Sequence, residues 1–342
     1  MTTESQPDQD PSLTADECAA DPIVRWGIVA TGTISRQMTA DLRLVEGADV
    51  AAVSSRDLQK ADAFADEFEI PQRYGDYREL LDAEIDAVYI GSPHVTHFEI
   101  AKAALLAGKH VLCEKPMGLS AAEVRELGAL AARQRLFLME AMWMKFNPLH
   151  IRLLELLRSG RIGEVRSVDA SFGIPFQKDD SSRWKAEMRG STLLDQGIYP
   201  VTLAHMVFGI PEAIQAAGVV RDDGVDLSEH FTLSYSDGRY ARGASSMVEF
   251  LDLGASICGT KGWISTEPGF WATSKMTVHT PFSPDSEPNE PIETLWEGNG
   301  YVPMLRAVNE SIVRGELENT THTNEDAAAV FDSLDEIRRQ LS

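Results

Sequence analysis

Short apolar stretches alternate with helix-like stretches over the first 140 residues of this 342-residue chain. The apolar stretches, read as strands, are residues 23–30, 49–54, 87–90, 110–113 and 136–139. Fully apolar strands separated by helices are typical of a parallel sheet with helices on both faces. The pattern therefore predicts an α/β fold for this part of the chain.

The first predicted strand leads through a glycine-containing turn into a helix, which is the setting of a dinucleotide-binding fingerprint. The fingerprint is imperfect, because Ala30 and Ser35 replace two of its three glycines, whereas the central Gly32 is kept. Any strand–turn–helix unit remains an alternative. The residues predicted to bind the dinucleotide here are Ala30, Thr31, Gly32, Thr33 and Ile34. With the alternating pattern, they predict an N-terminal Rossmann domain.

The second predicted strand ends in Ser55 and Arg56, where a Rossmann fold places the group that meets the adenosine ribose. An acidic residue at this position bonds the 2′-hydroxyl of NAD, whereas arginine suits a 2′-phosphate. We therefore expect NADP rather than NAD. The alternative is an exposed loop arginine.

The strand at 110–113 follows a helix-like run that stops at Gly108, and it is cut by Glu114-Lys115-Pro116. Proline cannot continue a central ladder, so the chain should leave the sheet here. In a parallel sheet this end is the carboxyl edge, where ligands bind. Lys115 would then place an ammonium group in a crevice; the alternative is a solvated surface lysine.

The remaining sequence has a different pattern, with strands that recur without helices between them: 165–172, 214–220, 230–235, 238–248 and 256–265. A helix at 148–159 precedes them, a loop is predicted at 280–291, and helices at 304–314 and 325–339 close the chain. We expect a disordered acidic tail (1–22), a Rossmann domain (23–143) and an α+β substrate and dimerisation domain (144–342). The second domain should hold a large, mainly antiparallel, open-faced sheet, and the C-terminal helix could pack back on the first domain.

Composition excludes several classes of function. A net charge of −22 disfavours nucleic acid, because phosphate binding relies on lysine and arginine. No apolar run is long enough to span a bilayer, and the cysteines (Cys18, Cys113, Cys258) form neither a disulfide framework nor a zinc motif. We expect a cytoplasmic protein.

Several segments form a set that occurs together: Gly27-Ile28-Val29-Ala30-Thr31-Gly32, Ser55-Arg56, Ala107 to Pro116, Tyr89-Ile90-Gly91-Ser92-Pro93-His94, Met139-Glu140-Ala141-Met142-Trp143 and Leu193-Leu194-Asp195-Gln196-Gly197-Ile198-Tyr199. Together they resemble the glucose–fructose oxidoreductase/inositol dehydrogenase (Gfo/Idh/MocA) family. The Ala-Thr-Gly turn and the Gly-Ile-Tyr ending are similar to the dihydrodiol dehydrogenase and NADP-dependent D-xylose dehydrogenase branch.

The resemblance implies a catalytic set of Lys115, Tyr199 and Asp195. Lys115 would lie beside the nicotinamide and the substrate hydroxyl, and Tyr199 would be the general base. Asp195, four residues earlier, would share its helix face and orient the group or bind substrate. A neighbouring ammonium should lower the pKa of a tyrosine. The alternatives are a helix-face aspartate and an ordinary buried tyrosine.

The resemblance also implies further contacts. Along the cofactor it places Ser92, Pro93, His94, His97, Glu114 and Trp143. Trp143 and Arg183 are also candidate substrate contacts, although a core tryptophan is a close alternative. His94 and His97 have the spacing of two metal ligands, but no third is apparent, so no metal is predicted. Relatives usually carry glycines where Arg189 stands, which puts substrate identity in doubt.

The function predicted on this basis is NADP-dependent oxidation of a sugar, an aldose such as D-xylose or D-glucose oxidised at C1. The alternatives are a trans-1,2-dihydrodiol dehydrogenase and a catalytically silent NADP-binding regulator. The expected partner is a small sugar or cyclic diol, with no nucleic acid and no membrane. A homodimer through the second-domain sheet is also expected.

Overall fold

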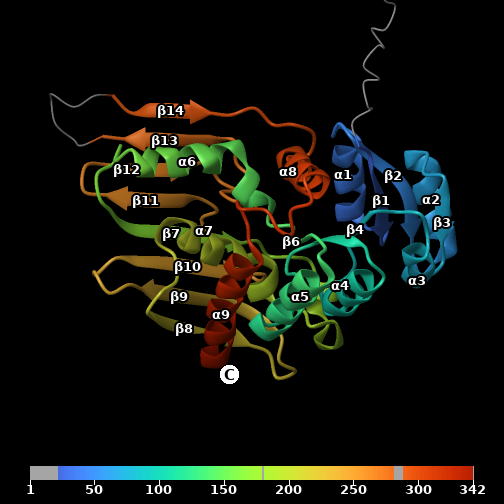
Figure 1. Cartoon of the computed structure of the whole chain (residues 1–342). Helices are drawn as coiled ribbons and strands as arrows, with labels where there is room; N and C mark the ends of the chain where they lie inside the picture. The colour runs from blue at the N-terminus through green and yellow to red at the C-terminus, as the bar shows by residue number, and fades with distance from the viewer. Residues whose placement is uncertain (1–21, 179–180, 281–287, 342) are drawn as a thin grey trace, which may run out of the picture.

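The computed structural model describes residues 22–178, 181–280 and 288–341, and it contains two sheets (Figure 1). The first is parallel, with strand order β3-β2-β1-β4-β5-β6. Its strands are β1 (Val24–Val29), β2 (Ala48–Ser54), β3 (Gln72–Tyr74), β4 (Ala87–Ile90), β5 (His110–Cys113) and β6 (Leu138–Glu140). The parallel α/β sheet expected from the alternating pattern is confirmed.

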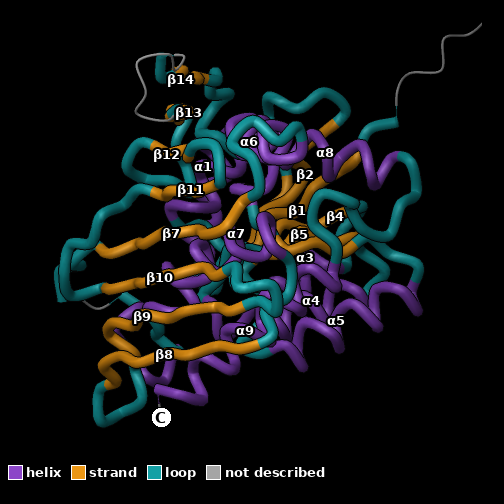
Figure 2. The backbone as a smooth tube through the Cα atoms, turned by 90° about the vertical axis from the view of Figure 1, so that its left-hand side faces the viewer, coloured by secondary structure: helices purple, strands orange, loops and turns teal. Residues whose placement is uncertain are grey.

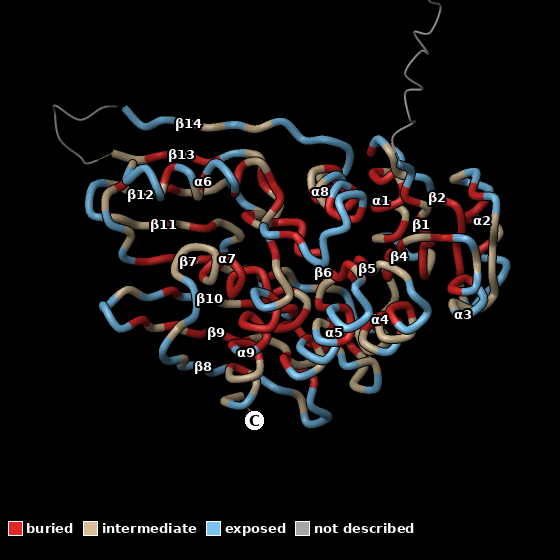
Figure 3. The backbone as a smooth tube through the Cα atoms, viewed as in Figure 1, coloured by how far each residue is buried: buried red, intermediate tan, exposed pale blue. Residues whose placement is uncertain are grey.

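The helices between these strands begin and end where their sequences indicate. They are α1 (Thr33–Leu42), α2 (Leu58–Phe68), α3 (Tyr77–Leu81), α4 (His97–Leu106) and α5 (Ala121–Gln134). Ser120 caps α5 by accepting a hydrogen bond from Glu123 N, and Glu123 accepts one from Leu119 N. Helices on both sides bury β4 and all but the first residue of β5 (Figure 3), which explains their apolar sequences.

The order of the sheet reverses between β1 and β4, which are neighbours although two strands separate them in sequence. Beyond the carboxyl ends of such a pair, the loops diverge and leave a crevice. The turn around Gly32 follows β1, and the loop from Gly91 follows β4. The fold therefore brings the fingerprint turn and the segment of Ser92 and His94 to the same edge.

The second sheet has the order β14-β13-β12-β11-β7-β10-β9-β8 (Figure 2) and is antiparallel except between β7 and β10. Its strands are β7 (Val165–Gly173), β8 (Ala213–Val220), β9 (Asp226–Ser234), β10 (Tyr240–Ser246), β11 (Ala255–Gly259), β12 (Trp263–Thr266), β13 (Lys275–His279) and β14 (Glu290–Glu293). The mainly antiparallel second sheet is confirmed.

Two details of this half were predicted wrongly. The single strand expected at 256–265 is the hairpin of β11 and β12, because Gly259 and Gly262 allow a tight reversal between them. The loop expected at 280–291 ends early, since β14 begins at Glu290 and pairs with β13. Residues 281–287 and nearly all of the predicted tail at 1–22 lie outside the described residues.

Four helices lie in the second half of the described chain: α6 (Pro148–Arg158), α7 (Ile198–Phe208), α8 (Val302–Val313) and α9 (Asn324–Leu341). Helix α9 packs against α5, where Asp332 pairs with Arg125 and Asp335 accepts a hydrogen bond from Ala121 N. No helix in the described part of the chain is both long and apolar enough to cross a membrane. We keep 23–143 and 144–342 as a proposed division into domains.

His150 in α6 makes stability dependent on pH. It is buried, neither ring nitrogen has a hydrogen-bond partner among the described residues, and burial lowers its pKa to about 4. The folded state therefore binds fewer protons than the unfolded state between pH 4 and 6.5, and stability falls as the pH drops through this range. His150 alone should lower the free energy of unfolding by about 2 kcal/mol between pH 8 and pH 5.

Urea unfolding at pH 8 and pH 5 measures this cost. Over that interval the free energy of unfolding of His150→Leu should fall by about 2 kcal/mol less than that of the wild type. His230→Leu is the control, because it makes the same substitution at an exposed position. Equal losses in the wild type and His150→Leu would contradict the prediction.

Candidate active site

Lys115 lies just beyond β5, with its side chain only 14% exposed. Its ammonium group donates to the Asp195 carboxylate at 3.0 Å and to the Asp195 carbonyl oxygen at 2.9 Å. The alternative of a solvated surface lysine is therefore wrong. Burial alone would lower the pKa of Lys115, but Asp195, Tyr199 and Glu114 together outweigh burial and the pKa is raised. Lys115 is thus a fixed positive charge and not a proton acceptor at neutral pH.

Asp195 is held between two cations. Lys115 binds its Oδ1 atom, while Arg183 donates to Oδ2 from Nε at 3.1 Å and from Nη2 at 3.0 Å. The Arg183 guanidinium also lies 3.7 Å from the centre of the Phe176 ring. Burial alone would raise the pKa of Asp195, but Lys115, followed by His94 and Arg183, lowers it well below its usual range. Asp195 therefore stays ionised and is unsuited to act as a base.

Tyr199 follows Asp195 by four residues, and both meet Lys115. A π-helical turn (Leu193–Gly197) carries the aspartate and runs into α7, whose second residue is the tyrosine. Single π turns occur often at functional sites. The Lys115 Nζ atom lies 5.2 Å from the centre of the Tyr199 ring. The structure thus brings the three predicted catalytic residues together.

Among the described residues, the phenol of Tyr199 has one hydrogen-bond donor, the indole N–H of Trp143 at 3.0 Å. Burial raises the pKa of Tyr199, whereas Lys115 and the Trp143 bond lower it, and burial prevails. The expected lowering of this pKa is therefore wrong in sign, although Lys115 does act in the expected direction. At neutral pH the tyrosine is protonated.

Aromatic side chains form the walls beside these groups. Phe172, at the end of β7, stacks on Trp271 with ring centres 3.5 Å apart, and both lie about 6 Å from the ring of Tyr199. Tyr301 packs against Trp143 at 4.7 Å. The cavity they surround has a volume of about 390 Å³. Its lining also includes Ile34, Ser92, His94, His97, Glu114, Lys115, Phe176, Arg183 and Asp195.

Sequence reasoning missed Phe172, Phe176, Trp271 and Tyr301. They come from three separate segments, and an isolated aromatic residue does not show which cavity it lines. The only signal was the position of Phe172 and Phe176 at and just past the end of a strand.

The turn after β1 fits the phosphates of a dinucleotide. Gly32 is the N-cap of α1; among the described residues no side chain caps this helix end, and a Cβ on Gly32 would meet no atom within 4 Å. The first N–H groups of the helix are therefore open to an anion. Ala30 has a φ of +79°, a conformation that explains why glycine usually stands there. Arg56 is exposed, and no hydrogen bond or ion pair holds it within the described chain.

In the loop after β4, some side chains face the cavity and others are already bound within the protein. Ser92 shares a hydrogen bond with Thr96 at 2.7 Å, and His94 lines the cavity, where burial lowers its pKa to about 3. Both ring nitrogens of the buried His97 contact backbone oxygens, of Pro116 at 2.7 Å and of Ser92 at 2.6 Å. His97 therefore braces the loop and has no nitrogen left for a cofactor or a metal.

Glu114 lies between the crevice and the buried sheet. It accepts hydrogen bonds from the Tyr89 hydroxyl at 3.0 Å and from Lys115 N at 3.1 Å. Burial raises its pKa to about 7, although Lys115 opposes the shift. The carboxyl group can therefore gain or lose a proton near neutral pH. Across the described residues, no three His, Cys, Asp or Glu side chains are placed to hold a metal ion.

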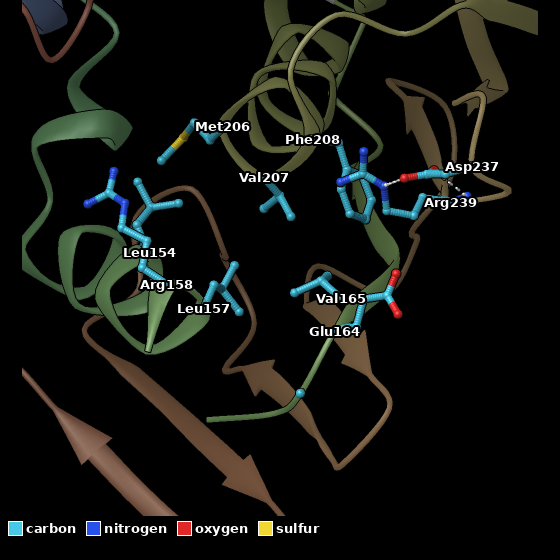
Figure 4. Close-up of a pocket in the computed structure, with 11 residues that line it drawn as sticks. Leu154, Leu157, Arg158, Glu164, Val165, Met206, Val207, Phe208, Asp237 and Arg239 are labelled. Carbon is cyan, nitrogen blue, oxygen red and sulfur yellow. Dashed lines mark hydrogen bonds and ion pairs between the residues drawn. The ribbon is translucent and has the colours of Figure 1, made fainter. Parts of the chain in front are cut away.

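A larger cavity of about 470 Å³ lies elsewhere, between α6, the end of α7 and the start of β7 (Figure 4). Apolar and charged side chains both line it, and Asp237 and Arg239 form an ion pair at one side. None of the residues predicted to carry chemistry lines this cavity. The candidate active site is therefore the smaller cavity around Lys115.

Comparisons with known proteins agree with this fold and site. Residues 24–142 match the model of an oxidoreductase family with an NAD-binding Rossmann fold, and residues 150–265 match the GFO/IDH/MocA C-terminal domain. The human trans-1,2-dihydrobenzene-1,2-diol dehydrogenase is 35% identical over 93% of this chain and 97% of its own length. The pig enzyme of that name is 37% identical, with the same coverage of both chains.

Two solved structures show the same fold. A 3-ketoreductase from Actinomadura kijaniata, in complex with NADP and TDP-benzene, has a TM-score of 0.84 and 26% identity, covering 93% of this chain and 98% of its own. An aldose–aldose oxidoreductase from Caulobacter crescentus has a TM-score of 0.83 and 23% identity, over 93% and 97%. This chain belongs to the Gfo/Idh/MocA oxidoreductase family. It is an NAD(P)-dependent dehydrogenase that acts on CH–OH groups.

Proposed function

We propose that this protein uses NADP to oxidise a ring hydroxyl of a sugar or cyclic diol, with an aldose oxidised at C1 to a lactone as the first candidate. The observation that carries the proposal is the meeting of Lys115, Asp195 and Tyr199 at one cavity. Aromatic walls suit the flat faces of a ring, and the charged groups suit its hydroxyls. A regulator that only sensed the cofactor would have no need of this set.

The division of labour follows from the charges. A bound nicotinamide would supply the acceptor for the hydride that leaves the substrate carbon, and the protein must take the proton from the hydroxyl. Tyr199 is the proposed acceptor, because Asp195 is already neutralised by two cations and Lys115 is protonated. Lys115 and the N–H of Trp143 then stabilise the phenolate. In reduction, the protonated tyrosine returns the proton.

A second candidate is oxidation of a trans-1,2-dihydrodiol. It is supported by relatives of that name at about 35% identity over most of the chain, and by the aromatic cavity. Both candidates require removal of hydride and a proton from a CH–OH group of a ring, so the same residues serve either. They differ in the rest of the ring, which bears several hydroxyls in one case and a diene in the other.

The test is the absorbance of reduced nicotinamide with NADP or NAD and a panel of aldoses, inositols and trans-dihydrodiols. Turnover with aldoses supports the first candidate, and turnover with dihydrodiols alone supports the second. Tight binding of NADP without turnover of any compound would reject both and favour the regulator. The sheet-mediated homodimer and the cytoplasmic location remain predictions, and light scattering tests the first.

Arg56 is proposed to select NADP through the 2′-phosphate. Because its guanidinium is exposed beyond β2 and has no partner among the described residues, a phosphate gains charge-assisted hydrogen bonds at little cost. Arg56→Ala should raise the KM for NADP by about 10- to 100-fold and leave the KM for NAD within about twofold. Arg43→Ala is the control, because Arg43 is bound to Phe68 O and Glu69. An equal rise in the KM for NADP and the KM for NAD would contradict the proposal that Arg56 binds the 2′-phosphate.

A further inference from the structure

Asp41 is a fully buried carboxylate on α1 that belongs to none of the motifs above. It accepts four hydrogen bonds from a segment more than 250 residues away. Asn299 donates from its backbone N at 2.7 and 2.9 Å and from Nδ2 at 2.8 Å, and Tyr301 donates from its backbone N at 2.9 Å. Burying a carboxylate is costly unless it is bonded in this way. The contact is therefore a specific attachment of the segment 294–301 to α1.

The backbone of this segment is shaped around the carboxylate. Gly298 has a φ of +58° and Gly300 a φ of +97°, which side-chain-bearing residues rarely adopt. A Cβ on Gly298 would collide with the carboxylate of Asp41, and one on Gly300 with the ring of Trp296. Both glycines are thus needed for the loop to close over Asp41.

The attached segment supports the group that bonds Tyr199. The ring of Tyr301 packs on Trp143 with centres 4.7 Å apart, and Trp296 meets the same indole edge-on at 6.2 Å. The indole N–H of Trp143 in turn donates to the phenol oxygen of Tyr199. A continuous set of contacts therefore runs from Asp41 through the loop and Trp143 to the proposed proton acceptor.

We propose that Asp41 is a positioning residue for Tyr199: it clasps the segment 294–301 so that Tyr301 and Trp296 hold the Trp143 indole against the phenol. This inference rests on the proposed function and deepens it. Asp41 also lies on the helix whose N-terminus faces the cofactor crevice. The clasp therefore joins the cofactor-binding helix to a wall of the substrate cavity.

Loss of the clasp should free the loop without separating the two halves of the protein. Helix α8, directly after the loop, is fixed independently, because Asn309 accepts from Trp26 Nε1 at 3.2 Å and donates to Glu46 O at 3.3 Å. The α9–α5 contacts also remain. An Asp41 variant should therefore fold and bind NADP.

The test compares Asp41→Ala and Asp41→Asn with Asp335→Asn. Asp335 is a matched control, because its carboxylate also accepts a backbone N–H across more than 200 residues, on α9, and lines none of the site. The first readout is hydrogen–deuterium exchange of 294–301, which should rise in Asp41→Ala, rise less in Asp41→Asn, and stay unchanged in Asp335→Asn. This readout needs no turnover, so it holds even if no substrate on the panel reacts.

The second readout is kinetic. In Asp41→Ala, kcat for oxidation should fall by about 10- to 100-fold with the Kd for NADP within about twofold, because only the tyrosine is misplaced. The pH at which kcat begins to level off should also rise, since Trp143 no longer stabilises the phenolate. Unchanged exchange, an unchanged kcat or pH profile, or equal effects in Asp335→Asn would overturn the proposal. Should Asp41→Ala fail to fold, Asp41→Asn decides by the same criteria.

Discussion

Lys115→Met is expected to lower kcat for alcohol oxidation by about 10³-fold or more, which corresponds to about 4 kcal/mol of transition-state stabilisation. The methionine keeps most of the volume of the lysine and removes only its charge. Without that charge, neither the developing alkoxide nor the Tyr199 phenolate has a cation beside it. Asp195 keeps Arg183 as a partner, so the site should not unfold. Steady-state kinetics and the melting temperature measure both effects.

Lys145→Met is the matched control for this substitution. Lys145 is 13% exposed and pairs with Asp326 at 3.0 Å, much as Lys115 is 14% exposed and pairs with Asp195 at 3.0 Å. It lies outside the active-site cavity, so its loss should cost stability but leave kcat within about twofold. If Lys115→Met kept more than a tenth of the activity, or if both variants lost activity equally, Lys115 would have no electrostatic role in catalysis.

The sequence allowed the parallel sheet to be predicted closely because its strands are marked by two signals at once. The stretches 87–90 and 110–113 are apolar throughout, since both faces of the sheet are covered, and Gly91 or Glu114-Lys115-Pro116 ends each of them. Helix α4 ends as expected just before Gly108, which has a φ of +76°. Where the apolar pattern and the chain-breaking residues agree, the local sequence is enough to locate a strand and its ends.

The second sheet was harder to predict because many of its residues are exposed and its strand order depends on pairing between distant segments. Strand β13 pairs with β12 and β14, and no local pattern identifies these partners. Only two of the five residues of β13 are buried, so its sequence has no continuous apolar run that would predict a strand. The hairpin of β11 and β12 was merged into one strand for the same reason.

The site was predicted only in part, because some of its contacts join segments that are far apart in the sequence. The family resemblance indicated Lys115, Asp195 and Tyr199 together, and they do meet. It could not indicate that Arg183 would be the second cation bound to Asp195. Nor could it indicate that Asp41 would bind the segment that packs against Trp143. Such roles arise from tertiary contacts between segments that carry no shared motif.

The pKa of Tyr199 shows what residue types alone leave out. The sequence indicates a neighbouring ammonium, which favours the phenolate, but it says nothing about how deeply the phenol lies. In the structure Tyr199 is 5% exposed, and desolvation outweighs Lys115. The sign of the shift therefore had to come from burial, and it decides the direction of the pH dependence below.

Tyr199→Phe is expected to lower kcat for oxidation by about 10²- to 10⁴-fold, the usual contribution of a positioned acid or base. The aromatic ring and its packing against Phe172 and Trp271 remain, so the KM for the substrate should change little. Tyr235→Phe is the control, because Tyr235 is also a buried tyrosine with a raised pKa, and its hydroxyl bonds Gly209 O outside the cavity. That variant should keep the activity of the wild type.

The pH profile separates a proton-transfer role from a packing role. Because the raised pKa keeps Tyr199 protonated at neutral pH, the fraction able to accept a proton rises about tenfold per pH unit until the pKa is reached. Wild-type oxidation should therefore accelerate from pH 7 upward, whereas reduction, which needs the phenol protonated, should not. In Tyr199→Phe the residual rate should lose this dependence. If the variant kept the same alkaline rise, the proton would leave through another group, and His94 would be the next residue to replace, because it faces the same cavity and is neutral at this pH.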